Sequence, residues 1–480
     1  MRKPVKLCIL FGVLLALCAA AFAVSRREEK KEQIKNSGEV VLAIPSDSVT
    51  ALSWENESGS FAFTKGENGW SYDEDAAFPV DAEKIGKMLA QFEAFTAAFV
   101  IEDVEDFAQY GLEEPEASIT ITSDETQYTL TIGNFSQMDA QRYVAPGDGR
   151  VYLVEHDPLE EFDAVLRDMV RDDVIAEFDR AERLRFTGMQ DYSLAREEET
   201  ESLCPDDVYF TDGMPLDTEL VEDYLSALRS LKLTNYVSYN VTDEELASFG
   251  LDAPELSVTL DYSLLDEEEN DEGETVQSVA ETGSFTIALS RSPEEQRAYE
   301  QAVENGDETL PSVTCYARLN ESQLVYEITQ SEFEALTAAS RDTLRHQALF
   351  TARFDTVAAI DVTLEGEEVS FVCSKPDEQS EENAEETWTW EGAEFDITAL
   401  RSALRAVTAD RFTGETPEGQ EEISLCVRLD NETFPTFTLT LYRCDAESCL
   451  AVVDGEPTAF VPRSQMLDLA EAVRGVLLAQ

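Results

Sequence analysis

Positive charge is scarce in this sequence outside its amino terminus. The chain holds 35 Lys plus Arg against 100 Asp plus Glu, a formal net charge of -65, and eight of the basic residues fall within the first 36 positions. A surface so rich in carboxylates repels nucleic acid and anionic lipid headgroups. We therefore expect no nucleic-acid partner.

Motifs for common chemistry are also missing. The sequence has no G-x-S-x-G, no Walker loop and no G-x-G-x-x-G after a predicted strand; these patterns serve a nucleophilic serine, a bound phosphate and a dinucleotide. With 2 His and no C-x-x-C pair, zinc is not expected either. We accordingly predict no catalytic, cofactor-binding or metal-ligating residue, no cofactor, and a protein that is not an enzyme.

The histidines and tryptophans stand in contexts that favour structure over chemistry. His156 follows a predicted strand and His346 a predicted helix, so surface or helix-capping roles are expected for both. Three tryptophans lie near acidic residues: Trp70, Trp388 and Trp390. A glycosidase would also have aromatic residues that stack on the sugar near its acidic residues. Because the tryptophans recur at equivalent positions of a repeat, we expect them to pack under helices.

The amino terminus carries an export signal. An uncharged stretch of 18 residues, Leu7 to Val24, follows a basic segment and is just long enough to span a bilayer. We expect an uncleaved membrane anchor at 1–24 and a charged tether at 25–44, with cleavage after Ala23 or lipidation of Cys18 as alternatives. The basic end stays inside, which predicts a single-pass cell-membrane protein whose carboxy-terminal bulk is extracytoplasmic.

Six of the eight cysteines lie beyond this segment, an even number that is compatible with disulfides in an exported protein. Cys444 and Cys449 flank a short turn and could face each other across a hairpin. Buried free thiols are the alternative. The six are Cys204, Cys315, Cys373, Cys426, Cys444 and Cys449.

An amphipathic helix pattern recurs three times. Its first copy follows Pro79-Val80-Asp81, and the second follows Leu216-Asp217 with every apolar position 136 residues later. The third follows Phe395-Asp396 in the same phase. The apolar positions are Ile85, Met88, Leu89, Phe92 and Phe95; Val221, Tyr224, Leu225, Leu228 and Leu231; and Leu400, Ala403, Leu404 and Val407.

The flanks of these helices recur as well. A strand pair with an aromatic turn precedes each helix, and in two copies a short acidic helix with a Gly-Leu-x-x-Pro stop comes after it. Gly supplies the left-handed residue that ends a helix, and Pro prevents its continuation. The stops lie at Gly111–Pro115 and Gly250–Pro254, and Thr242 to Glu245 has capping-box spacing.

Strands and a closing helix complete each copy, the helices being expected at 158–169, 331–344 and 464–478. The fold class is therefore α+β, with three tandem divergent modules at 45–174, 175–349 and 350–480. Each should hold a mainly antiparallel sheet and one or two packed amphipathic helices. Acidic segments at 265–283 and 375–386 interrupt the second and third modules and are expected to be solvated hairpin insertions. Asp271 stands where an EF-hand loop requires Gly, so specific calcium binding is not expected.

Several short motifs of the chain occur together in one known family. They are Trp70, Tyr72, Pro79-Val80-Asp81, Tyr110-Gly111-Leu112, Pro115, Ile132-Gly133, Tyr143 and Val151-Tyr152. With these motifs the chain resembles the bacterial family called domain of unknown function 4340, most clearly over residues 45–172 and more weakly through the other modules. The resemblance implies a membrane-associated accessory role, because members are often encoded beside the ATP-binding and permease components of gliding-type ABC transporters.

Two functions of different class follow. The first is a non-catalytic, membrane-anchored, extracytoplasmic binding or scaffold protein, accessory to an ABC-type transporter or an envelope complex, with a transporter permease or another envelope protein as partner. The alternative is an exported, carboxylate-dependent hydrolase acting on cell-wall or polysaccharide material.

Overall fold

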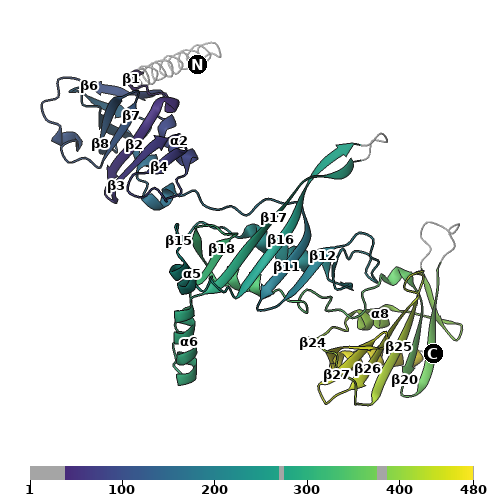
Figure 1. Cartoon of the computed structure of the whole chain (residues 1–480). Coiled ribbons are helices and arrows are strands. Elements are labelled where there is room, and N and C mark those ends of the chain that lie inside the picture. Colours follow the sequence, from purple (N-terminus) through teal and green to yellow (C-terminus); the bar gives the residue numbers. More distant parts are fainter. Residues whose placement is uncertain (1–37, 270–274, 376–385, 479–480) are drawn as a thin grey trace, which may run out of the picture. The chain divides into compact units, whose positions relative to one another are not determined.

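The computed structural model describes residues 38–269, 275–375 and 386–478 and has an α+β architecture with mainly antiparallel sheets (Figure 1). The chain divides into two compact units: the first runs to Asp173 and includes Ser238–Asn240, and the second holds Val174–Val237 and the chain from Val241. The expected anchor and most of the tether lie outside the described residues. Within those residues, no helix has both the length and the apolar composition to cross a bilayer.

The first unit is built on an eight-stranded sheet of order β4-β3-β2-β7-β8-β9-β10-β6, beside a two-stranded sheet of β1 and β5. Its elements are β1 (Glu39–Leu42), η1 (Ser46–Ser48), β2 (Val49–Asn56), β3 (Gly59–Gly66), β4 (Gly69–Tyr72), α2 (Ala82–Ala90), β5 (Phe95–Ala97), β6 (Phe99–Ile101), η2 (Ala108–Tyr110), β7 (Ala117–Ser123), β8 (Thr126–Ser136), β9 (Gln141–Ala145), β10 (Val151–Val154), α3 (Leu159–Phe162) and η3 (Leu166–Met169).

The second unit holds two nine-stranded sheets, β14-β13-β12-β11-β16-β17-β18-β19-β15 and β23-β22-β21-β20-β25-β26-β27-β28-β24. The elements of the first are β11 (Arg180–Gly188), β12 (Tyr192–Arg196), β13 (Tyr209–Thr211), β14 (Met214–Pro215), α4 (Thr218–Ser230), β15 (Tyr236–Ser238), α5 (Asp243–Phe249), β16 (Leu256–Glu269), β17 (Thr275–Arg291), α6 (Pro293–Asn305), β18 (Cys315–Leu319), β19 (Val325–Ile328) and α7 (Gln330–Thr337). Those of the second are η4 (Phe354–Thr356), β20 (Val357–Leu364), β21 (Glu367–Ser374), β22 (Thr387–Trp390), β23 (Ala393–Phe395), α8 (Thr398–Arg405), β24 (Arg411–Phe412), β25 (Glu421–Leu429), β26 (Thr436–Arg443), β27 (Ser448–Val453), β28 (Glu456–Pro462) and α9 (Arg463–Leu478).

The three large sheets share one topology. In each, strands run outward from the centre, three in the first sheet and four in the other two, and a helix follows. A four-strand meander then returns beside the first strand, so that β2 pairs with β7, β11 with β16 and β20 with β25. A strand between this helix and the meander closes the far edge as β6, β15 or β24. The internal repeat inferred from the helix pattern is therefore also a repeat of sheet order.

The repeated helices form where their apolar spacing predicts. Asp81 and Asp217 cap the first two, each carboxylate accepting two backbone N–H groups of the first turn. The side chains of Met88, Leu225 and Leu404 are fully buried, so one face of α2, α4 and α8 packs on its core. Phe95 is buried as predicted but belongs to β5, because α2 ends at Ala90.

The two stops also have the predicted conformation. Gly111 and Gly250 have φ of 71° and 74°, and Leu251 N–H donates back to Leu246 O at 2.8 Å. The capping box is confirmed, because Thr242 N–H donates to Glu245 Oε2 at 2.9 Å and Glu245 N–H to Thr242 Oγ1 at 3.3 Å. In the first module, however, the expected short helix is only the 3₁₀ turn η2.

The closing helices were predicted too long in two copies. Only α9 matches its expected range; α7 ends at Thr337, and the first is broken into α3 and η3. The break has a tertiary cause: Trp54 Nε1 and Asn56 Nδ2 each donate to Ala164 O at 3.1 Å. That carbonyl would otherwise accept a bond within a continuing helix.

The acidic segment of the second module is a continuation of its sheet. Strands β16 and β17 remain paired out to Glu269 and Thr275, and they extend beyond the neighbouring strands in Figure 1. Helix α6, which the sequence analysis missed, follows β17 and buries only Ala302. Most of the segment at 375–386 lies outside the described residues.

Candidate functional site

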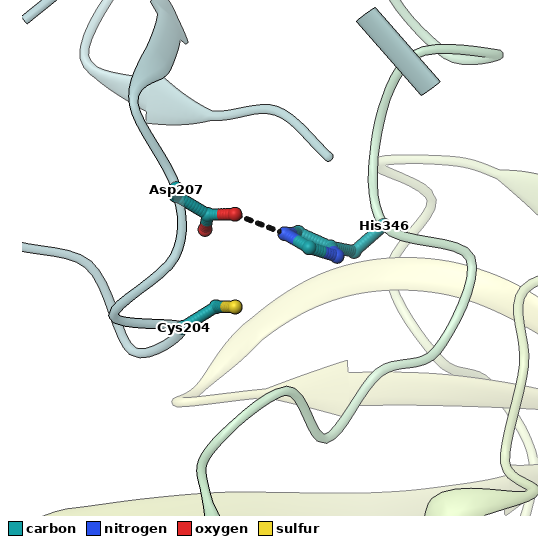
Figure 2. A group of neighbouring side chains, drawn as sticks. All are labelled: Cys204, Asp207 and His346. Atoms are coloured by element: carbon teal, nitrogen blue, oxygen red, sulfur yellow. Dashed lines mark hydrogen bonds and ion pairs between the residues drawn. The ribbon is translucent and has the colours of Figure 1, made fainter. Parts of the chain in front are cut away.

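One polar cluster unites residues that are distant in the sequence. Cys204, Asp207 and His346, here called the junction cluster, place a sulfur, a carboxylate oxygen and an imidazole nitrogen within 4.8 Å of one another. Figure 2 shows the first two side chains leaving one loop and approaching His346, which comes from a separate stretch of chain. Among the described residues, this is the one group of three ligand-type side chains so close together.

The loop between β12 and β13 positions two members of the cluster. Asp207 N–H donates to Cys204 O at 3.2 Å, which closes a tight turn around Pro205. Ser202 Oγ donates to Asp207 Oδ2 at 2.7 Å, so this oxygen is held in place. Asp207 has only 1% of its side chain exposed. A buried carboxylate requires such partners.

The third member is held by the start of α4. His346 Nε2 lies 2.7 Å from Asp207 Oδ1, and its Nδ1 lies 3.2 Å from Asp217 Oδ2. Asp217 is the N-cap of α4, and its other oxygen accepts from Glu219 N–H at 2.9 Å. Asp217 N–H also donates to Leu344 O at 2.9 Å, which ties the segment before His346 to the helix. Both imidazole nitrogens are therefore engaged by carboxylates.

The electrostatics of the cluster disfavour a nucleophilic cysteine. Burial raises the pKa of the Cys204 thiol more than the hydrogen bond from the Asp206 backbone N–H lowers it, and the negative charge of Asp207 raises it further. Burial alone would lower the pKa of His346, but Asp207 and Asp217 outweigh it and raise that pKa above the ordinary value. A cysteine nucleophile needs a lowered pKa and an imidazole free to accept its proton. In this structure Cys204 has neither a lowered pKa nor a free imidazole beside it.

A hollow of about 250 Å³ adjoins the cluster. Its lining includes His346 and Ser202 on one side and Phe412 of β24 and Phe437 of β26 on the other. It therefore lies where the loop of the second sheet meets the third. This hollow provides open space beside the imidazole.

Two of the larger hollows in the second unit contain a titratable side chain that is not activated. The first, of about 560 Å³, contains Asp212, whose carboxylate lies 3.4 Å from Arg341. The second, of about 490 Å³, contains Cys315, whose pKa burial raises to about 11. The carboxylate is paired and the thiol is protonated at neutral pH, so neither hollow presents an activated group from these residues.

The residues that the sequence analysis singled out lie apart from one another. His156 is exposed, as expected, whereas the surface or capping interpretation of His346 is wrong, since only 19% of its side chain is exposed between two carboxylates. Trp388 is buried in its core, while Trp70 and Trp390 are half-buried. All six described cysteines are free thiols, including Cys444 and Cys449.

Sequence reasoning missed the junction cluster. Its only local signal is Cys204-x-x-Asp207, which has the spacing of a paired metal-ligand turn with a carboxylate in the second position. His346 is 139 positions from Asp207, and no pattern links them.

Comparison with known proteins gives one match. The family model described as domain of unknown function (DUF4340) matches residues 70–211 and 207–425. Both matches begin at equivalent strands, β4 and β13, which agrees with the repeated sheet order. No curated protein and no solved structure matches the chain.

Proposed function

Because the chain belongs to the DUF4340 family, whose function is unknown, we propose a role from its surfaces: a non-catalytic, membrane-anchored, extracytoplasmic binding or scaffold protein, accessory to an ABC-type transporter or envelope complex. In this proposal residues 1–24 span the membrane, and the three modules form the extracytoplasmic part. The partner is a transporter permease or another envelope protein.

The observation that supports this proposal is the polar face shared by the three sheets. In the central strands, buried apolar side chains alternate with more exposed, mainly polar ones: β7 buries Ile119 and Ile121 and leaves Thr120 half-exposed between them. The buried face packs under the helices, and the other carries serine and threonine. Such a hydroxyl-rich face suits contact with another protein, and in the first sheet it holds a hollow of about 220 Å³ beside Ser118 and Thr120.

The hydroxyl pairs recur at corresponding places. Thr259 and Thr286 are bonded through their hydroxyls at 2.8 Å across β16 and β17, and Ser424 and Thr440 at 2.9 Å across β25 and β26. Ser118 and Thr131 are opposite each other in β7 and β8. These cross-strand pairs help to keep the polar faces ordered. Charged side chains lie on the same faces in the second and third sheets, where Arg185 is opposite Thr259 and Arg428 pairs with Asp361 at 3.1 Å.

Site-specific photocrosslinking in intact cells tests the proposal. A photoreactive residue at Thr120, Thr286 or Thr440 should yield adducts with envelope membrane proteins. Placed at Glu300 of α6 or Glu471 of α9, which are exposed helix positions, it should yield few adducts. Equal labelling at all five positions, or adducts at none, would contradict a partner on the sheet faces.

A second measurement separates this role from attraction to the acidic ribbon, the paired ends of β16 and β17 within residues 265–283. Replacing Glu267–Gln277 by Asn-Gly joins Asp266 to Ser278, which are already opposite each other, through a two-residue hairpin. The shortened chain should still co-purify with the same membrane proteins from detergent extracts. Loss of the partner would place binding on the ribbon instead of the sheets.

A further inference from the structure

We propose that the junction cluster is a binding site for one divalent transition-metal ion, with zinc as the best match. Cys204 Sγ, Asp207 Oδ1 and His346 Nε2 are the protein ligands, and Asp217 orients the imidazole from behind. The inference does not depend on the proposed binding role. Its basis is the donor set, the geometry and the fixed orientation of each ligand.

The donor set distinguishes this site from the acidic surface. Sulfur, imidazole nitrogen and carboxylate oxygen together are ligands that zinc accepts, whereas calcium and magnesium prefer oxygen alone. Carboxylates are abundant on this chain, but a thiol, an imidazole and a buried carboxylate converge among the described residues only here. The donor atoms of the cluster therefore favour zinc over calcium and magnesium.

The distances fit with a small adjustment. Zinc bonds of about 2.0–2.3 Å in tetrahedral geometry place ligand atoms about 3.3–3.8 Å apart. The three atoms of the cluster already lie within 4.8 Å of one another, and Nε2 and Oδ1 are 2.7 Å apart. An ion between them would open the short contact by less than about 1 Å and draw the sulfur inward by at most about 1.5 Å.

The supporting contacts match those of metal-bound histidines. Such histidines commonly donate the second ring N–H to a carboxylate, which fixes the tautomer and directs the free nitrogen to the metal. Asp217 Oδ2, 3.2 Å from Nδ1, is placed for this role, and the first turn of α4 holds Asp217 itself. Ser202 supports Asp207 in the same way through its 2.7 Å hydrogen bond.

Binding has a simple balance of charge and protons. The S–H bond of Cys204 breaks, its proton goes to solvent, and the thiolate binds the ion. His346 binds through the Nε2 lone pair and releases any proton held there. One thiolate and one carboxylate then neutralise a divalent ion, and water from the adjoining hollow of about 250 Å³ can fill the fourth position.

Cobalt(II) titration of the purified full-length chain in detergent tests the site. The chain is first stripped with a chelator and then kept in excess magnesium, which occupies the acidic surface. We expect one cobalt ion per chain, a thiolate-to-cobalt charge-transfer band, and the strong visible bands of tetrahedral cobalt, all displaced by zinc. Zinc should also raise the melting temperature of the stripped chain, because it binds only the folded state.

Three variants test the site: one replaces a ligand, one the supporting carboxylate and one a control cysteine. Cys204→Ser should abolish the charge-transfer band and the zinc-dependent rise in melting temperature. Asp217→Asn should keep the band but weaken zinc binding by about 10–100-fold, as expected for a supporting carboxylate. Cys426→Ser is the matched control, since Cys426 is also half-buried but lies outside any ligand group among the described residues.

Two results would contradict the proposed metal site. A charge-transfer band that survives in Cys204→Ser, or a wild-type chain that shows only weak octahedral cobalt bands in excess magnesium, overturns the proposal. If circular dichroism shows that Cys204→Ser is unfolded, the Asp217→Asn affinity decides: unchanged zinc binding in that variant also rejects the site as described.

Discussion

At the residue scale, the same side chain takes different roles according to what surrounds it. His156 is exposed, while His346 is held between Asp207 and Asp217. Asp172 differs from Asp207, whose carboxylate oxygens accept hydrogen bonds. The Oδ1 of Asp172 is buried without a hydrogen-bond partner among the described residues. Burial, reinforced by the charges of Asp173 and Asp81, raises its pKa to about 6.

Asp172→Asn should therefore stabilise the protein at neutral pH. The folded pKa of about 6 exceeds the ordinary 3.8, so the folded state binds more protons in this range, and stability falls as pH rises through it. Allowing for partial solvent exposure, we expect a gain of about 0.5–1 kcal/mol above pH 6. Urea denaturation followed by tryptophan fluorescence measures it.

The control for this prediction is Asp163→Asn, which removes an exposed carboxylate from the same segment. It corrects for the general loss of negative charge. The difference between the two variants should shrink as the pH is lowered from 6 towards 3.8. A difference that is independent of pH would show that the cause is packing and not ionisation.

At the element scale, the two helix stops show what a local sequence pattern can predict about a structure and what it cannot. Gly111 and Gly250 adopt the left-handed conformation that the Gly-Leu-x-x-Pro pattern predicts. What the pattern does not reveal is their close contact with the sheet. A Cβ at Gly250 would lie 2.6 Å from Ser290 Oγ and 3.0 Å from Arg291 O. The stop therefore packs against β17 as well as ending α5.

Gly250→Ala should destabilise the protein more than Gly306→Ala. Gly306 ends α6 with a φ of 73°, almost the 74° of Gly250, but a Cβ there meets nothing within 4 Å. Left-handed alanine costs about 1–2 kcal/mol at both sites. Crowding should add about 1–3 kcal/mol at Gly250 alone. Equal losses in chemical denaturation would mean that Ser290 and its neighbours move aside without cost.

Helix α6 shows why an element can be missed. Periodicity identifies helices by an apolar face, and α6 buries only Ala302. Its terminal signals were nevertheless present: Ser292 accepts from Glu295 N–H, Pro293 is at the first position, and Gly306 ends the helix. Capping residues, not the apolar pattern, would have revealed it.

At the scale of the whole molecule, the dominant physical fact is the charge of -65. Repulsion among surface carboxylates opposes the compact state, and salt screens it. We expect the melting temperature to rise by several degrees between ~20 mM and ~150 mM sodium chloride, and then to level off. Sucrose, which stabilises without screening, is the control. A melting temperature that falls with salt would show that ion pairs outweigh the repulsion.

The sequence by itself determined the repeat, the positions of its main strands and helices, and the helix stops. Apolar spacing, glycine conformation and proline position act over a few residues, so they are readable without tertiary information. The buried faces of α2, α4 and α8 were predicted for this reason, through residues such as Met88 and Leu225.

Only the tertiary structure decided where the closing helices end and which polar residues meet. Trp54 Nε1 donates to the Ala164 carbonyl where the first closing helix is broken. Asp217 N–H donates to the Leu344 carbonyl, which ties the segment after α7 to the start of α4. The same contact near Leu344 carries His346 to Asp207, 139 residues away. Such meetings depend on packing between elements distant in the chain, which no local pattern encodes.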